Sequence, residues 1–140
     1  MNTNKIVIGT IAGGVAFFLL GWLIYGMLLT EFMKANYNQC AMKPMEDMIW
    51  WAMILSNLVW ALLYAMLFSW TNTSTLMSGA KMGFIIGFLI ILSFDLSFYA
   101  MSNMFFGRRA LCVDILAGTI TSTIGGAVIG WVMGMGKKAA

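Results

Sequence analysis

SNMFFGRRALCVDILAGTITSTIGGAVIGWVMGMG, residues 102–136, is a long apolar segment with one charged edge. Arg108 and Arg109 stand before the apolar run, and Asp114 follows just inside it. Small residues then recur at every fourth position: Gly118, Ser122, Gly126, Gly130 and Gly134. Membrane helices use such small residues to bring their backbones close together. The segment therefore predicts a transmembrane helix that packs closely against another helix.

The composition places the whole chain in the membrane. It is 61% hydrophobic and only 9% charged, with a mean hydropathy of +0.89, far from the values of a soluble domain. Each apolar run has about 24 residues, enough to cross a bilayer core of about 30 Å as a helix. We expect an all-α membrane protein, a four-transmembrane-helix bundle forming a single domain over 1–140, with helices at residues 6–29, 47–70, 78–101 and 110–135.

The ends of these runs carry further expectations. The first run is too long for the apolar part of a signal peptide and has no cleavage site near Gly26, so we expect a retained helix. Tyr25 suits an aromatic belt at the interface. Pro44, followed by acidic residues, predicts the start of the second helix at residue 47. The short turn at 71–75 predicts an antiparallel hairpin of the second and third helices.

Small residues also line two other runs, and the second run contains an amide. Gly9 and Gly13 are four residues apart in the first run, a spacing that favours packing within the chain. The third run carries its own four-residue ladder: Gly79, Gly83 and Gly87. Asn57 lies near the middle of the second run, where an amide needs a partner on a neighbouring helix. These ladders exceed what one small bundle needs, which favours docking of a further helix.

The most informative single residue is Asp95, a carboxyl well inside the third run. An ionised carboxylate facing lipid is costly, so Asp95 should face the bundle, water or a cation. Asp114 should lie at a similar depth, because a short loop joins the two helices. Two interpretations stay open: Arg108 or Arg109 folds inward and neutralises the aspartates, or the two carboxyls share an exchangeable proton.

Other chemistry is sparse. Cys40 and Cys112 fall on the same side of the predicted bundle, where a disulfide and two separate thiols are equally compatible. The chain has no histidine and no Cys-x-x-Cys motif, so we expect no metal site and no cofactor. The fourteen methionines favour flexible filling of gaps in the bundle, with a Cu(I) site as the alternative. No nucleophile is paired with a base, which argues against an enzyme, and the scattered charge argues against nucleic acid.

The basic residues divide evenly between the two sides of the predicted bundle. Those on the side of the termini are Lys5, Lys81, Lys137 and Lys138, and those on the loop side are Lys34, Lys43, Arg108 and Arg109. The count of four against four gives no orientation by the positive-inside rule. We favour both termini in the cytoplasm, because the terminal lysines are close to the spans.

Two motifs resemble a known family. Phe106-Gly107-Arg108-Arg109-Ala110-Leu111, followed by Gly126-Ala127-Val128-Ile129-Gly130, resembles the last helix of the small bacterial four-helix membrane proteins called domain of unknown function 1761. The first helix is similar near its end, where Gly21 precedes Ile24-Tyr25 in place of the Trp-Tyr pair of that family. The resemblance implies a four-helix fold in a bacterial inner membrane, and it implies no reaction.

Two functional hypotheses follow. The first is a non-enzymatic packing or accessory subunit that associates through its glycine-rich helix faces, with itself or within a larger membrane complex. The second is a small proton- or cation-coupled carrier that uses Asp95 and Asp114, with Arg108 and Arg109 as gating charges.

Overall fold

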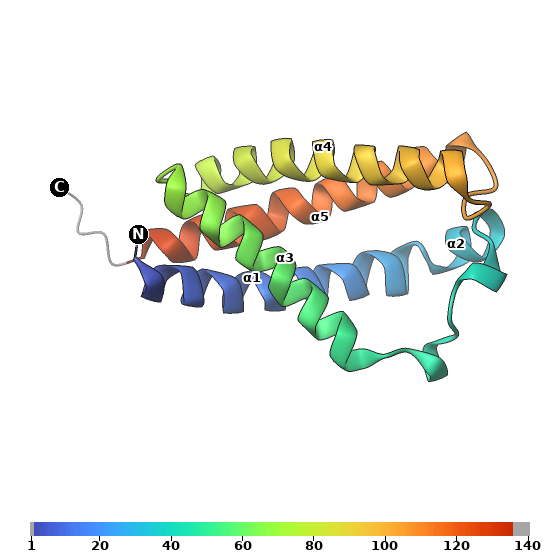
Figure 1. Cartoon of the computed structure of the whole chain (residues 1–140), viewed down its shortest axis with the longest axis horizontal. Coiled ribbons are helices and arrows are strands. Elements are labelled where there is room, and N and C mark those ends of the chain that lie inside the picture. Colours follow the sequence, from blue (N-terminus) through green and yellow to red (C-terminus); the bar gives the residue numbers. More distant parts are fainter. Residues whose placement is uncertain (1, 136–140) are drawn as a thin grey trace.

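The computed structural model describes residues 2–135, which are predominantly helical and contain no β-strand. Four helical segments are long and apolar enough to cross a membrane, which confirms the prediction of an all-α four-helix bundle (Figure 1). The elements in chain order are α1 (Thr3–Leu23), the π-helical η1 (Ile24–Leu28), α2 (Thr30–Asn36), the 3-10 turns η2 (Gln39–Ala41) and η3 (Met45–Asp47), α3 (Trp50–Trp70), α4 (Leu76–Met101) and α5 (Arg108–Gly134).

Helix ends differ from the predicted ones by two or three residues where local capping decides them. Helix α4 begins at Leu76 rather than at residue 78, because Thr75 is its N-cap. The Thr75 hydroxyl accepts a hydrogen bond from the Ser78 amide at 3.1 Å, and the Ser78 hydroxyl accepts one from the Thr75 amide at 3.2 Å. This reciprocal capping box satisfies two backbone donors that a helix start leaves unpaired.

The predicted start of the second helix at residue 47 is wrong. Pro44 is followed only by the single turn η3, after which Met48 is extended, with ψ of 131°, and Ile49 is non-helical, with ψ of 85°. Helix α3 therefore begins at Trp50. These non-helical residues let the loop turn back towards α1, a tertiary requirement that the local signals do not contain.

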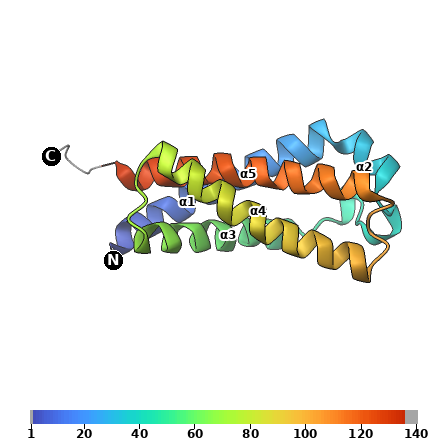
Figure 2. The ribbon, with the colours of Figure 1, turned by 90° about the horizontal axis from the view of Figure 1, so that it is seen from above.

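Helices α4 and α5 lie side by side and make the closest contact in the bundle (Figures 1 and 2). A Cβ atom added at Gly126 would lie 2.6 Å from the Gly79 carbonyl oxygen and 2.8 Å from the Gly83 Cα. One added at Gly130 would lie 2.8 Å from the Gly79 Cα. The two glycine ladders thus face each other inside the chain, where a side chain on either would force the backbones apart.

Helix α1 packs against both α3 and α5 through its own small residues. A Cβ atom at Gly13 would meet the Ile129 side chain at 2.5 Å and the Ala61 methyl at 3.0 Å. Further along α1, the Phe17 ring meets the Tyr64 ring edge to face, with centroids 5.5 Å apart. The Gly9–Gly13 pair is therefore used for packing within the chain, as predicted.

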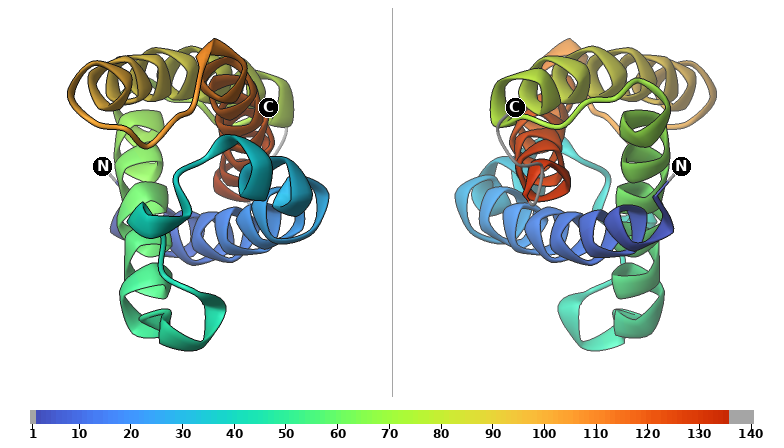
Figure 3. Two further views of the ribbon diagram at one scale, coloured as in Figure 1. Left: turned by 90° about the vertical axis from the view of Figure 1, so that its right-hand side faces the viewer. Right: turned by 90° about the vertical axis from the view of Figure 1, so that its left-hand side faces the viewer.

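The expected hairpin of α3 and α4 forms only at their connection. The two helices meet at residues 71–75, but α3 then crosses the bundle obliquely, and its first turns lie beyond α1, away from α4 (Figures 1 and 3). The glycine face of α4 is occupied by α5, whereas Ala61 and Ala65 of α3 meet the glycines of α1. Small-residue contacts, rather than chain proximity, decide which helices pair.

The loops at the far end of the bundle are tied together by backbone hydrogen bonds. The Asn38 amide donates to the Met104 carbonyl at 2.9 Å, and the Phe106 amide donates to the Asn36 carbonyl at 2.9 Å. Between them, Tyr37 forms an isolated antiparallel bridge with Phe105. This clamp closes the bundle end that contains the start of α5.

We predict that Gly126→Ala lowers the free energy of unfolding by about 1–3 kcal/mol, because its methyl group has no room between the α4 and α5 backbones. Gly21→Ala is the matched control, since a Cβ there has no atom within 4 Å, and it should leave stability unchanged or raised. Unfolding in detergent micelles, followed by circular dichroism, measures both. Equal stability of the two variants would contradict the close contact.

Candidate functional site

The buried carboxyl of Asp95 is the centre of the candidate site. Asp95 lies on α4 between apolar neighbours and is only 6% exposed. Its Oδ2 atom is buried and has no hydrogen-bond partner among the described residues. A buried carboxyl oxygen without a partner in an apolar span is energetically costly.

The helix register places Asp114 beside Asp95. The α4–α5 contacts advance four residues along α4 for every four residues back along α5, through the pairs Gly79–Gly130, Gly83–Gly126, Gly87–Ser122 and Ile91–Gly118. The next step of this register pairs Asp95 with Asp114, and their carboxyls are close enough to interact directly. The two aspartates, which were expected at a similar depth, are thus also neighbours.

Two tyrosines complete the cluster, and sequence reasoning missed both in this role. The Tyr37 hydroxyl donates to Asp114 Oδ1 at 3.0 Å, and the Tyr25 hydroxyl donates to the Asp114 backbone carbonyl at 3.5 Å. Tyr37 is only 1% exposed, although it lies in the long loop. Tyr25, expected in an interfacial belt, turns inward from the π-helical segment η1. No sequence signal marks Tyr37, because its contact depends on the loop clamp.

The environment of Tyr37 favours its neutral form. Burial, together with the charge of the nearby Asp114 carboxylate and the hydrogen bond to it, raises the pKa of the Tyr37 hydroxyl above its usual value. Tyr37 therefore stays a hydrogen-bond donor to Asp114 across the physiological pH range.

The arginines are not part of this cluster. Arg108 and Arg109 are exposed, and neither forms an ion pair with a carboxylate within residues 2–135. The ion pair that the described chain does contain joins Lys34 to Glu31 at 2.7 Å on the surface. The interpretation in which an arginine folds inward is therefore not the arrangement observed, because tyrosine hydroxyls, not guanidinium groups, occupy the space beside Asp114.

The remaining predicted positions lie elsewhere. Cys40 and Cys112 are both exposed, and both thiols are free. The Asn57 side-chain amide donates to the Met53 carbonyl of its own helix at 2.8 Å. The prediction that this amide bonds to a neighbouring helix is therefore wrong. Among residues 2–135, no three His, Cys, Asp or Glu side chains gather as metal ligands. Lys137 and Lys138, which entered the orientation argument, lie outside the described residues.

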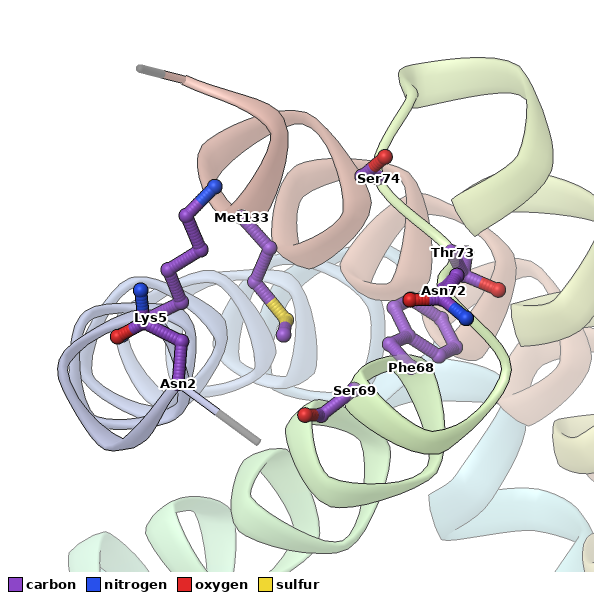
Figure 4. Close-up of a pocket in the computed structure, with 8 residues that line it drawn as sticks. All are labelled: Asn2, Lys5, Phe68, Ser69, Asn72, Thr73, Ser74 and Met133. Carbon is purple, nitrogen blue, oxygen red and sulfur yellow. The ribbon is translucent and has the colours of Figure 1, made fainter. Parts of the chain in front are cut away.

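Two cavities adjoin the bundle. A cavity of about 300 Å³ lies at the end where α1 begins, lined by Asn2, Lys5, Phe68, Ser69, Asn72, Thr73, Ser74 and Met133 (Figure 4). It contains none of the residues predicted as functional. A larger one of about 500 Å³ lies between α1, α3 and the long loop, and Tyr25 forms part of its wall. The larger cavity therefore borders the carboxyl cluster.

No known family model, curated protein or solved structure matches this chain. The fold alone defines its class: four apolar helices make it an integral membrane protein.

Tyr37→Phe tests the hydrogen bond and the raised pKa together. At neutral pH the variant should lose about 1–2 kcal/mol of stability with the bond to Asp114. Because the pKa of Tyr37 is raised in the folded state, its contribution to stability is fully present below the unfolded tyrosine pKa of about 10 and is lost as the pH rises through the folded value. The stability difference between wild type and Tyr37→Phe should therefore shrink above about pH 10.

Unfolding in detergent at a series of pH values measures this difference. Tyr99→Phe, at an exposed position of α4, is the control for loss of a tyrosine hydroxyl. A difference between wild type and Tyr37→Phe that stays constant into the alkaline range would contradict the raised pKa.

Proposed function

We propose that this protein is a small proton-coupled membrane carrier in which Asp95 and Asp114 form the proton-binding site. The observation that carries the proposal is a pair of adjacent carboxyls inside the spans, without a cationic partner in the described chain and with Asp95 Oδ2 unpaired. Two adjacent ionised carboxylates in a medium of low dielectric repel each other strongly. Binding one proton removes the repulsion.

The two carboxyls differ in their hydrogen-bond partners. Tyr37 donates to Asp114 Oδ1 and so satisfies one oxygen of that carboxyl. Asp95 has no such donor on Oδ2 and is the natural holder of the shared proton. Loss of that proton would leave two negative charges side by side, which favours either a new proton or a monovalent cation. The cycle makes and breaks no bond besides that of the exchanged proton, in keeping with the expectation of a non-enzymatic protein.

The accessory-subunit hypothesis rested on glycine faces left free to dock another helix. The faces of Gly79, Gly83 and Gly87 and of Gly126 and Gly130 are filled from within the chain. The hypothesis therefore loses the observation that favoured it over the carrier.

Our proposal places the carrier in a bacterial inner membrane with both termini cytoplasmic, as the resemblance and the terminal lysines suggest. Cys40 tests the orientation, because its thiol is free and exposed in the loop. In the Cys112→Ser variant, which leaves Cys40 as the remaining thiol, a membrane-impermeant maleimide should label Cys40 in intact cells, and adding Cys40→Ser should abolish that labelling. Labelling of Cys40 only after the membrane is opened would indicate the opposite orientation.

For the proton site, Asp95→Asn should remove the carbonyl stretch of a protonated carboxylic acid from the infrared spectrum of the purified protein. The exposed loop variant Glu46→Gln is the matched control and should leave the band in place. Arg108→Gln with Arg109→Gln should also leave it, because both arginines are exposed. A wild-type spectrum without this band would contradict a shared proton.

In sealed vesicles, Asp95→Asn and Asp114→Asn should each abolish the pH-dependent flux that the wild type supports, while both variants stay folded. Entrapped pH dye measures the flux after a pH gradient is imposed. Unchanged flux in both variants would refute the carrier, and a flux that follows sodium rather than pH would replace the proton with a cation.

A further inference from the structure

The larger cavity is a cleft with apolar walls between two membrane-spanning helices. Its walls come from α1, α3 and the loop between them. The apolar side chains that line it are Phe17, Phe18, Trp22, Met33, Met42, Met45, Met48, Trp50 and Met53. Its volume of about 500 Å³ is in the range of sites that hold a small ligand. We name it the α1–α3 cleft.

The cleft exists because α3 leaves α1 after the small-residue contacts end. Ala65 meets Gly9 and Ala61 meets Gly13, so the two helices are close at the end where α1 begins. Towards the loop, α3 crosses away, and the loop spans the gap (Figures 1 and 3). Gly21 lies on the cleft wall, and a Cβ atom there would have no neighbour within 4 Å, so the wall is open at this position.

The length of the cleft corresponds to one leaflet of a bilayer. It extends from Phe17, near the middle of α1, to Thr30, just beyond the end of the first span. The part within the span, from Phe17 to Leu28, covers about 17 Å of helix, slightly more than half of a hydrocarbon core of about 30 Å. An occupant of this shape has an extended apolar part that begins at the interface and ends near the bilayer centre.

Asn57 lines the cleft within α3, and the charged part of the lining lies at the loop end. Lys34, Gln39 and Lys43 line the cleft there, and the lining includes no Asp or Glu. Lys43 is exposed and forms no ion pair within residues 2–135, whereas Lys34 is paired with Glu31 at 2.7 Å. Two ammonium groups and an amide at the interface complement an anionic head group.

We propose that the α1–α3 cleft binds a phospholipid with an anionic head group, its acyl chain between α1 and α3 and its phosphate at Lys43 and Lys34. A docked transmembrane helix would need an apolar contact surface across both leaflets, whereas the cleft extends across only one leaflet. A bilayer lipid enters sideways without leaving the membrane. The proposal does not depend on proton coupling, because its readout is lipid retention.

The test compares lipids retained by the purified protein in native mass spectrometry, with phosphatidylglycerol and phosphatidylcholine as probes. Wild type should retain phosphatidylglycerol in preference to phosphatidylcholine. Gly21→Leu places a side chain in the open cleft and should weaken retention by at least about tenfold. Val15→Phe, on an exposed face of the same helix, is the matched control and should retain lipid as wild type does.

The head-group contact is tested separately. Lys34→Gln with Lys43→Gln should remove the preference for phosphatidylglycerol while phosphatidylcholine is still retained. Met53→Trp fills the cleft from α3 and provides a second blocking variant if Gly21→Leu fails to fold. Undiminished retention in both folded blocking variants, equal retention of the two lipids by wild type, or retention of free fatty acid alone would overturn the proposal.

Discussion

The direct contact of the α4 and α5 backbones is the constraint on which the rest of the structure depends. Gly79 and Gly83 meet Gly126 and Gly130 with no space for a Cβ atom between them. Lipid offers no hydrophobic reward for burying large side chains, so close approach and dispersion contacts hold such helices together. The same contact sets the register, and the register carries Asp95 to the side of Asp114.

That placement puts two carboxyl groups side by side in the apolar membrane, and the loop supplies a hydrogen-bond donor to one of them. Backbone hydrogen bonds clamp the loop so that Tyr37 reaches Asp114 Oδ1 at 3.0 Å. Neutral hydroxyls lower the cost of one carboxylate but supply no positive charge. The arginines stay exposed, since folding inward would exchange water for a partly solvated pair at little gain. In our proposal a proton or a cation relieves the repulsion within the carboxyl pair, which is the physical basis of the carrier.

A second consequence of small-residue packing is the divergence of α3. Because α5 occupies the glycine face of α4, α3 contacts α1 at Ala61 and Ala65 and crosses outward beyond them. The α1–α3 cleft and the carboxyl cluster then share a wall at Tyr25, whose ring lines the cleft and whose hydroxyl reaches Asp114. The two sites are therefore adjacent, although the groups that we propose for them differ in chemistry.

The amino-acid sequence by itself determined the four spans, because the length of an uninterrupted apolar segment decides whether it can cross the hydrocarbon core as a helix. It also determined that Asp95 and Asp114 share a depth, since both ladders step by four residues towards one short loop. Only the tertiary structure decided that the ladders face each other, that Tyr25 and Tyr37 join the aspartates while Arg108 and Arg109 do not, and that α3 leaves a cleft. Those outcomes depend on which surfaces meet across long sequence separations, and small residues permit several close pairings that local patterns do not distinguish.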